Sequence, residues 1–200
     1  MNRSSFIRLS SFFALILVAL TLSQCKKSSS NPGGSGNSGG YYLKFTLNGQ
    51  AVEYDSEPSA EITTKVNSDG LYTATLVAYK NFDLSSENEL LITVLSTSPI
   101  ADNVAYDDPQ KATEPNGSQV PEATVFWADS TGTGYLTVGS LADANGNIPI
   151  AGMVANAKLT ITELTSTDLK GTFSGTVYNA GNFSISDNIA NGTFYLKRTQ

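Results

Sequence analysis

Carboxylates are the side chains in this sequence that are numerous enough to support acid–base chemistry. The 200 residues include 18 Asp and Glu and no histidine. Two carboxyl groups that face each other across a cleft can hydrolyse a glycosidic bond, one as acid and the other as base or nucleophile. The candidates for such a pair are Glu53, Glu61, Asp129 and Glu163. A glycan-acting hydrolase is therefore one alternative function, and the distances between these groups decide it.

The composition excludes several other catalytic chemistries. Without histidine, the chain cannot form a Ser-His-Asp triad or the commoner zinc sites, and with a single cysteine it cannot form an intrachain disulfide. No segment resembles a nucleophile elbow, a phosphate-binding loop or a dinucleotide-binding motif. We therefore expect a non-catalytic protein that needs no cofactor.

Oxygen ligands for calcium occur in two places. Asp102, Asp107 and Asp108 lie in the region 98–122, where four prolines predict a long irregular loop. The segment 143–147 begins like a calcium-binding loop. It lacks the glycine at the sixth position and the glutamate at the twelfth, so it predicts a hairpin turn instead. Calcium binding by the 98–122 loop stays open at this stage.

Three pairs of adjacent aromatic residues are candidates for contact with a sugar. They are Tyr41-Tyr42, Phe126-Trp127 and Phe194-Tyr195. Because neighbouring side chains of a strand point to opposite faces, one ring of each pair can enter the core while the other faces outward. Exposed rings beside carboxylates or amides suit stacking on a sugar face, although an outer ring covered by a loop, or a tyrosine at a sheet edge, is the commoner arrangement.

The single cysteine follows a segment that is typical of a secretion signal. Arg3 and Arg8 precede the apolar run 12–20, which is shorter than the about 20 residues that a membrane span needs. The next segment, Leu22-Ser23-Gln24-Cys25, resembles a lipobox, the site where bacterial lipoprotein precursors are cut before a cysteine. Leu22 and Ser23 match the usual pattern, whereas Gln24 departs from the small residue normally found there.

This resemblance implies that residues 1–24 are a lipoprotein signal peptide and that Cys25 carries a diacylglycerol thioether. The modification would consume a thiol that is otherwise prone to oxidation in an exported protein. An uncleaved signal anchor and an ordinary cleaved signal with a free thiol are the alternatives.

Residues 25–40 are expected to form the lipidated cysteine and a disordered tether. The segment 26–40 consists of Lys, Ser, Asn, Gly and one Pro, which bury too little apolar surface to offset the entropy of ordering. Its fifteen residues would have an r.m.s. reach of roughly 20 Å. In many lipoproteins that stay in an inner membrane, an aspartate follows the lipidated cysteine, whereas this chain has Lys26 at that position. Surface export of lipoproteins in Bacteroides relatives resembles a rule that requires acidic residues soon after the cysteine, and residues 26–30 contain none. We therefore expect the outer membrane, with the periplasmic face favoured over the cell surface.

The remaining chain, residues 41–200, is strongly acidic. It contains 8 basic and 18 acidic residues, a net charge of −10. Such a surface repels phosphate, so nucleic acid and anionic headgroups are disfavoured as partners. We expect attachment to the membrane through the lipid, with a glycan or another envelope protein as partner.

Residues 41–200 predict one all-β domain. Apolar Leu43, Phe45 and Leu47 alternate with polar residues before Asn48-Gly49, which predicts a hairpin with a type I′ turn. Further strands are predicted at 62–66, 71–80, 89–97, 123–128, 134–141, 157–164, 169–178 and 192–197. Turn signals at 67–70, 145–147 and 191–192 separate them. The pattern favours an antiparallel β-sandwich or barrel of about 8–10 strands, with at most one helical turn at 84–88.

The end of the chain carries a family resemblance. Residues 169–177 read LKGTFSGTV and residues 191–196 read NGTFYL. These segments resemble the closing hairpin of small, uncharacterised lipoproteins of Bacteroides relatives, in which a GTFSGT strand is followed by an NGTF strand. The resemblance implies a lipid-anchored β-domain and no particular chemistry. In the first segment Phe173, Gly175 and Val177 should share one face, while Thr172, Ser174 and Thr176 form a Thr/Ser ladder on the other, exposed face. Gly171 and Gly175 inside the strand indicate a bulge or the close approach of another backbone or a ring.

The leading hypothesis from the sequence is a membrane-anchored envelope lipoprotein with a non-catalytic β-domain that binds a ligand or has a structural role. The alternatives are the glycan-acting hydrolase and a barrel that carries a small apolar ligand, which requires an enclosed apolar cavity.

Overall fold

The structure is a computed structural model that describes residues 40–55, 58–63, 66–79, 88–108, 111–142, 147–148 and 150–199. The predicted signal peptide, Cys25 and nearly all of the predicted tether lie outside these residues, as do most of the possible helical turn at 84–88 and part of the turn at 145–147. Within the described ranges there is no helix of the length and hydrophobicity that a membrane crossing requires.

The predicted all-β class is confirmed, with thirteen strands in the described part of the chain. The strands are β1 (Tyr42–Leu47), β2 (Gln50–Tyr54), β3 (Ser59–Ile62), β4 (Tyr72–Tyr79), β5 (Glu89–Ser96), β6 (Val104–Asp107), β7 (Lys111–Thr113), β8 (Gln119–Pro121), β9 (Ala123–Ala128), β10 (Gly134–Leu136), β11 (Lys158–Leu164), β12 (Asp168–Asn179) and β13 (Ser186–Thr199). One short 3-10 turn, η2, spans Gly139–Leu141.

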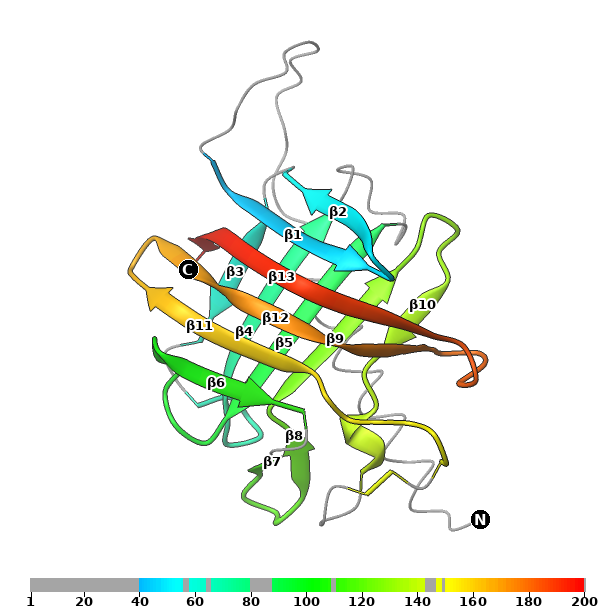
Figure 1. Ribbon diagram of the computed structural model, residues 1–200. Coiled ribbons are helices and arrows are strands. Elements are labelled where there is room, and N and C mark those ends of the chain that lie inside the picture. The colour runs from blue at the N-terminus through cyan, green and yellow to red at the C-terminus, as the bar shows by residue number, and fades with distance from the viewer. Residues whose placement is uncertain are drawn as a thin grey trace. The chain divides into compact units, whose positions relative to one another are not determined.

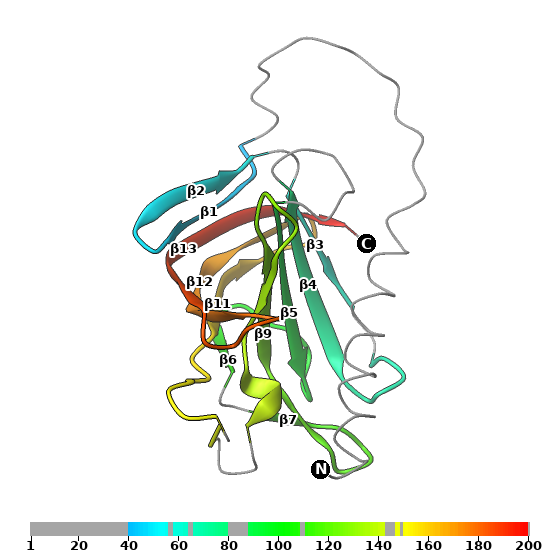
Figure 2. The ribbon, with the colours of Figure 1, turned by 90° about the vertical axis from the view of Figure 1, so that its right-hand side faces the viewer.

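Eleven of these strands form two layers (Figures 1 and 2), and β7 and β8 pair with each other in a separate two-stranded sheet. The front sheet has the order β2-β1-β13-β12-β11-β6, and the back sheet has the order β3-β4-β5-β9-β10. In Figure 1 the strands of the front sheet run across those of the back sheet. Crossed layers of this kind pack face to face and enclose a core between their inner faces.

Hydrogen bonds close the two layers into one continuous sheet at two corners. The end of β13 pairs with β3, the one parallel pairing among the described strands, and the end of β12 pairs with β10. The seven strands β13, β3, β4, β5, β9, β10 and β12 therefore form a closed cycle. The domain is thus both a sandwich and a closed sheet, as the predicted fold class allowed. It differs from that prediction in its one parallel pairing and in having thirteen described strands where about 8–10 were expected.

The opening hairpin follows its sequence closely. β1 and β2 pair around Asn48-Gly49, and both turn residues have positive φ, 49° and 83°. This is the backbone that a type I′ turn requires and that Asn and Gly adopt most easily. The predicted turn at 67–70 is also confirmed, because Gly70 has φ 78° and the Asn67 side chain accepts hydrogen bonds from the backbone N–H groups of Asp69 and Leu71.

Several predicted boundaries were wrong. The region 98–122 contains β6, β7 and β8 instead of one irregular loop. Its prolines are compatible with these strands, because none lies in β6 or β7 and Pro121 is the last residue of β8. The strand predicted at 62–66 begins earlier, with β3 at Ser59–Ile62, and residues 64–65 lie outside the described residues. The strand predicted at 134–141 ends at Leu136 and is followed by η2. Asn191-Gly192 lies inside β13, where Asn191 has φ 53°, and makes a bulge instead of a turn.

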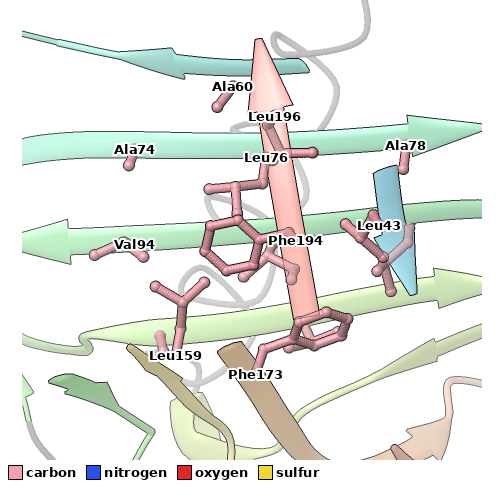
Figure 3. Close-up of a cluster of buried hydrophobic side chains, with 14 of the residues drawn as sticks. Leu43, Ala60, Ala74, Leu76, Ala78, Val94, Leu159, Phe173, Phe194 and Leu196 are labelled. Atoms are coloured by element: carbon pink, nitrogen blue, oxygen red, sulfur yellow. The ribbon is translucent and has the colours of Figure 1, made fainter. Parts of the chain in front are cut away.

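The core fills the space between the layers with complementary sizes of side chain. Large groups from the front sheet face a mixture of alanines and larger aliphatic groups, such as Leu76, from the back sheet, as Figure 3 shows. Phe194, Leu196 and Leu43 project from β13 and β1 toward Ala60, Ala74 and Ala78 of β3 and β4, and all six are at most 2% exposed. Bulky and small residues that alternate in this way interdigitate without voids.

The long strands β12 and β13 contribute one repeated element to this core. Gly171-Thr172-Phe173 in β12 lies antiparallel to Gly192-Thr193-Phe194 in β13, so that each glycine is paired with the phenylalanine of the other strand. A Cβ atom on Gly171 would overlap the Phe194 ring and the backbone oxygen of Thr160, and one on Gly192 would overlap Phe173. The predicted close approach of a ring to a strand glycine is therefore confirmed.

Gly171→Ala is expected to lower the free energy of unfolding by about 2–3 kcal/mol, because the added methyl group has no room beside the Phe194 ring and the neighbouring strand. The matched control is Thr172→Ala on the exposed side of the same strand, with an expected loss below about 1 kcal/mol. Chemical denaturation followed by tryptophan fluorescence measures both. Equal losses would contradict the packing described here.

Candidate functional site

A groove that is lined mainly by threonine and other polar residues, together with their apolar carbon atoms, lies on the outer face of the front sheet. Its volume is about 380 Å³, which is within the range of about 300–1,000 Å³ for small-ligand sites. The groove is open to solvent and runs over β11, β12 and β13. Its lining residues are Lys158, Thr160, Thr172, Phe173, Ser174, Asn191, Gly192 and Thr193.

Strand register places the polar groups of the groove in two rows. Thr160, Thr172 and Thr193 are direct cross-strand partners and form the first row. Lys158 and Ser174 are partners in the second. Adjacent strands are about 4.8 Å apart, so each row presents hydrogen-bonding groups at a spacing comparable to the length of a pyranose ring. The sequence anticipated a Thr/Ser ladder on an exposed face of β12 but not the neighbouring strands that complete it.

The bulge in β13 shapes one wall of the groove. Between its pairings with Phe173 and Gly175 of β12, strand β13 contains one more residue than β12. It likewise contains one more residue than β1 between its pairings with Lys44 and Thr46. The left-handed conformation of Asn191 accommodates this extra residue. The amide of Asn191 is exposed beside Thr193, while Gly192 presents backbone without a side chain.

A tyrosine cluster lies beside the groove on the same face. The rings of Tyr41 and Tyr195 have centroids 4.8 Å apart, and Tyr42 lies edge-on to Tyr195 at 6.4 Å. The Tyr41 hydroxyl donates a hydrogen bond of 2.7 Å to Asp168 Oδ1. This hydrogen bond raises the pKa of Tyr41 to about 12. Hydrogen bonds from Thr167 and Tyr41 lower the pKa of Asp168.

Lysine side chains cover the outward rings of this cluster. Lys170 Nζ lies 4.9 Å from the centroid of the Tyr195 ring, and Lys44 Nζ lies 4.8 Å from that of Tyr42. The same lysines form ion pairs of 2.8 Å with Glu163 and Glu53. Because cations and a neighbouring ring already occupy these aromatic faces, the cluster offers little surface for stacking on a sugar.

The aromatic doublets follow the predicted alternation in two cases of three. Phe194 and Trp127 are buried while Tyr195 and Phe126 are half-buried on the other face. Tyr41 and Tyr42 are both half-buried, so the prediction that one of them enters the core was wrong. Tyr41 precedes β1 and is not bound to the alternation of that strand, and its ring lies on Tyr195 instead.

The four carboxylates proposed for a hydrolase are not brought together. Glu53 and Glu163 lie on β2 and β11, which are four strands apart, or about 19 Å along the sheet. A glycosidase pair is separated by only about 5–9.5 Å. Glu61 is exposed on β3, opposite Thr75. Asp129 lies between β9 and β10, where burial alone would raise its pKa but hydrogen bonds from Thr131 and Thr133 lower it below the usual value.

The aspartates of the 98–122 region also diverge. Asp102 is exposed in a turn, Asp107 is half-buried on β6, and Asp108 is fully buried at the end of that strand. Among the described residues, no three acidic side chains lie close enough together to hold a metal ion. The calcium-like segment 143–147 lies almost entirely outside those residues.

Asp108 is a buried carboxyl group whose depth the sequence did not indicate. Its side chain lies directly against Gly139, at the start of η2, so closely that a Cβ atom there would overlap Oδ1. Neither carboxyl oxygen makes a well-formed hydrogen bond. Burial raises the pKa of Asp108 to about 7, although the nearby backbone N–H groups of Gly139 and Ala157 and the positive charge of Lys111 act to lower it. The group connects the end of β6 to the segment between β10 and β11.

Glu89 is a second buried carboxyl group that sequence reasoning assigned no role. It is 4% exposed, and burial raises its pKa, although a hydrogen bond from Tyr79 acts to lower it. The group lies at the first residue of β5, far from the groove in strand order. A single buried acid with a tyrosine partner provides hydrogen bonding for the fold and does not by itself make a catalytic pair.

Comparison with known proteins yields no relative. No family model matches the chain, no curated protein is significantly similar to it in sequence, and no solved structure is significantly similar to its fold.

Asp108→Asn is expected to change how stability depends on pH. A carboxyl group whose pKa is higher in the folded than in the unfolded chain destabilises the fold as it ionises, so this penalty grows from about pH 4 to pH 7 and is constant above. The variant has no such charge. Its free energy of unfolding should therefore rise relative to wild type across that window, by about 4 kcal/mol at most.

Urea denaturation at pH 4.5, 6 and 8 measures the difference between the two proteins. Asp102→Asn, which makes the same substitution at an exposed position, is the control. A constant offset between the Asp108 variant and wild type at all three pH values would contradict a buried carboxyl group with a raised pKa.

Proposed function

We propose that this chain is an envelope lipoprotein, anchored through a lipid on Cys25, whose non-catalytic β-domain binds a saccharide in the groove on the outer face of the front sheet. The observation that carries the proposal is the groove itself, in which three threonines, a serine and a lysine lie in register on three adjacent strands, with an asparagine at the bulge beside them. The periplasmic face of the outer membrane is the proposed location.

Hydroxyl and amide groups on a flat sheet match the chemistry of a sugar. Each can both donate and accept hydrogen bonds, as each sugar hydroxyl can. The strands that carry them are held from behind by the packed core, so the groups are positioned before the ligand arrives. Saccharide recognition here would rest on hydrogen bonds, since lysines and a neighbouring ring cover the outward tyrosine rings of the adjacent cluster.

Two features favour this proposal over the alternatives. The candidate carboxylates for hydrolysis are dispersed over the sheet, and Glu53 and Glu163 are each engaged in an ion pair with a lysine. An apolar ligand inside the domain would require an enclosed cavity, but the space between the layers holds close-packed side chains such as Phe194, Leu76 and Ile92. The groove, in contrast, is accessible from solvent.

Cys25→Ser tests the proposed anchor. The wild-type protein should gain the mass of a diacylglycerol at Cys25 and fractionate with membranes, whereas the variant should become soluble or keep its uncleaved signal. Mass spectrometry of the purified protein and ultracentrifugation of cell lysates measure the two properties. Identical behaviour of the two proteins would contradict lipid attachment without bearing on the groove.

Thr172→Tyr tests the groove. A ring at the centre of the threonine row would occupy the groove from a position whose side chain does not contact the core, so saccharide affinity should fall at least tenfold while the unfolding midpoint stays close to that of wild type. Calorimetric titration of the full-length protein in detergent with oligosaccharides from peptidoglycan and from lipopolysaccharide measures the affinity. Thr162→Tyr, exposed on β11 outside the groove, is the control. Equal affinity in all three proteins would contradict a saccharide site here.

A further inference from the structure

Lys158 differs from Lys44 and Lys170, two other lysines of the front sheet. Lys44 and Lys170 are each bound to a glutamate at 2.8 Å and lie over a tyrosine ring. Lys158 lines the groove, is exposed, and belongs to neither of the ion pairs among the described residues. The groove therefore contains a cation whose charge is not neutralised by a partner within it.

The surroundings of Lys158 restrict what that charge can bind. Ser174 is its cross-strand partner on β12, and the row of Thr160, Thr172 and Thr193 runs beside it. Asp107 is its cross-strand partner on β6 and has an interaction of its own. A ligand that enters the groove thus meets one ammonium group at the end near β6, with Asp107 on the next strand, and hydroxyl and amide groups along the rest.

From this arrangement we infer that the groove selects an acidic saccharide, a sugar that carries a carboxylate, and that Lys158 binds the carboxylate while the threonine row binds the hydroxyls. The inference rests on the proposed saccharide site and specifies its ligand. A charge-assisted hydrogen bond from an ammonium group to a carboxylate is roughly twice as strong as one between neutral groups. Because the domain carries a net charge of −10, selection must come from this direct contact and not from long-range attraction.

The test compares each acidic saccharide with a neutral form of the same molecule. Tetrasaccharides of galacturonate, of mannuronate and of hyaluronan, each beside its methyl ester, are titrated into the full-length protein in detergent. The ester retains the sugar hydroxyls and removes the negative charge. At least one acid should bind tenfold or more tightly than its ester. Lys158→Met should abolish this preference by lowering affinity for the acid far more than affinity for the ester, and Lys197→Met, at an exposed lysine of β13 outside the groove, should retain it.

Each other result overturns the inference in a distinguishable way. Equal binding of acid and ester, with no effect of Lys158→Met, would reject the acidic ligand and leave the saccharide site standing. Binding of none of the six saccharides would reject the inference and count against the proposed function as well. Binding of tetraglutamate as tightly as the best uronate would show that the groove recognises carboxylates without regard to the sugar, which would also reject it.

Discussion

The reciprocal packing of phenylalanine on glycine between β12 and β13 is the contact on which the rest of this domain depends. These two strands of the front sheet make both connections to the back sheet, since β12 pairs with β11 and β10 and β13 pairs with β1 and β3. Their inner face must therefore hold rings large enough to reach the back sheet. Gly171 and Gly192 leave the space that lets Phe194 and Phe173 lie flat against the partner strand, with ring centroids 6.4 Å apart.

The same pairing determines what the outer face presents. Because side chains alternate, two phenylalanines directed inward place Thr172 and Thr193 side by side on the outside. Strand β11 adds Thr160 to that row, and the bulge at Asn191 interrupts the regular surface next to it. The Gly-Thr-Phe segments of β12 and β13 thus pack the core with their phenylalanines and line the groove with their threonines. A substitution that disturbs the Gly-Phe contacts would therefore also displace the candidate binding groups.

How far the sequence could predict this arrangement depended on whether the deciding contact was local. Asn48-Gly49 specified its hairpin because the two flanking strands are adjacent in the chain. Asn191-Gly192 has the same residues, yet it forms a bulge, because the pairing of β13 with β12 and β1 and not the dipeptide decides whether the chain reverses. The Thr/Ser face of β12 was predictable from alternation. The groove was not, since its other walls come from strands whose register with β12 is set by long-range packing, and the depth of Asp108 likewise depends on its contact with the distant Gly139.

The hydrogen bond between Tyr41 and Asp168 has a mechanical consequence. Under the proposed anchoring at Cys25, any pull between the membrane and a bound envelope polymer would enter the domain at Tyr41, just before β1. There the load would meet the hydrogen bond to β12 and the ring contact with Tyr195 of β13 before it reached the β1–β13 ladder. The contacts of Tyr41 would thus distribute the force over β12 and β13 and delay the separation of β1 from β13.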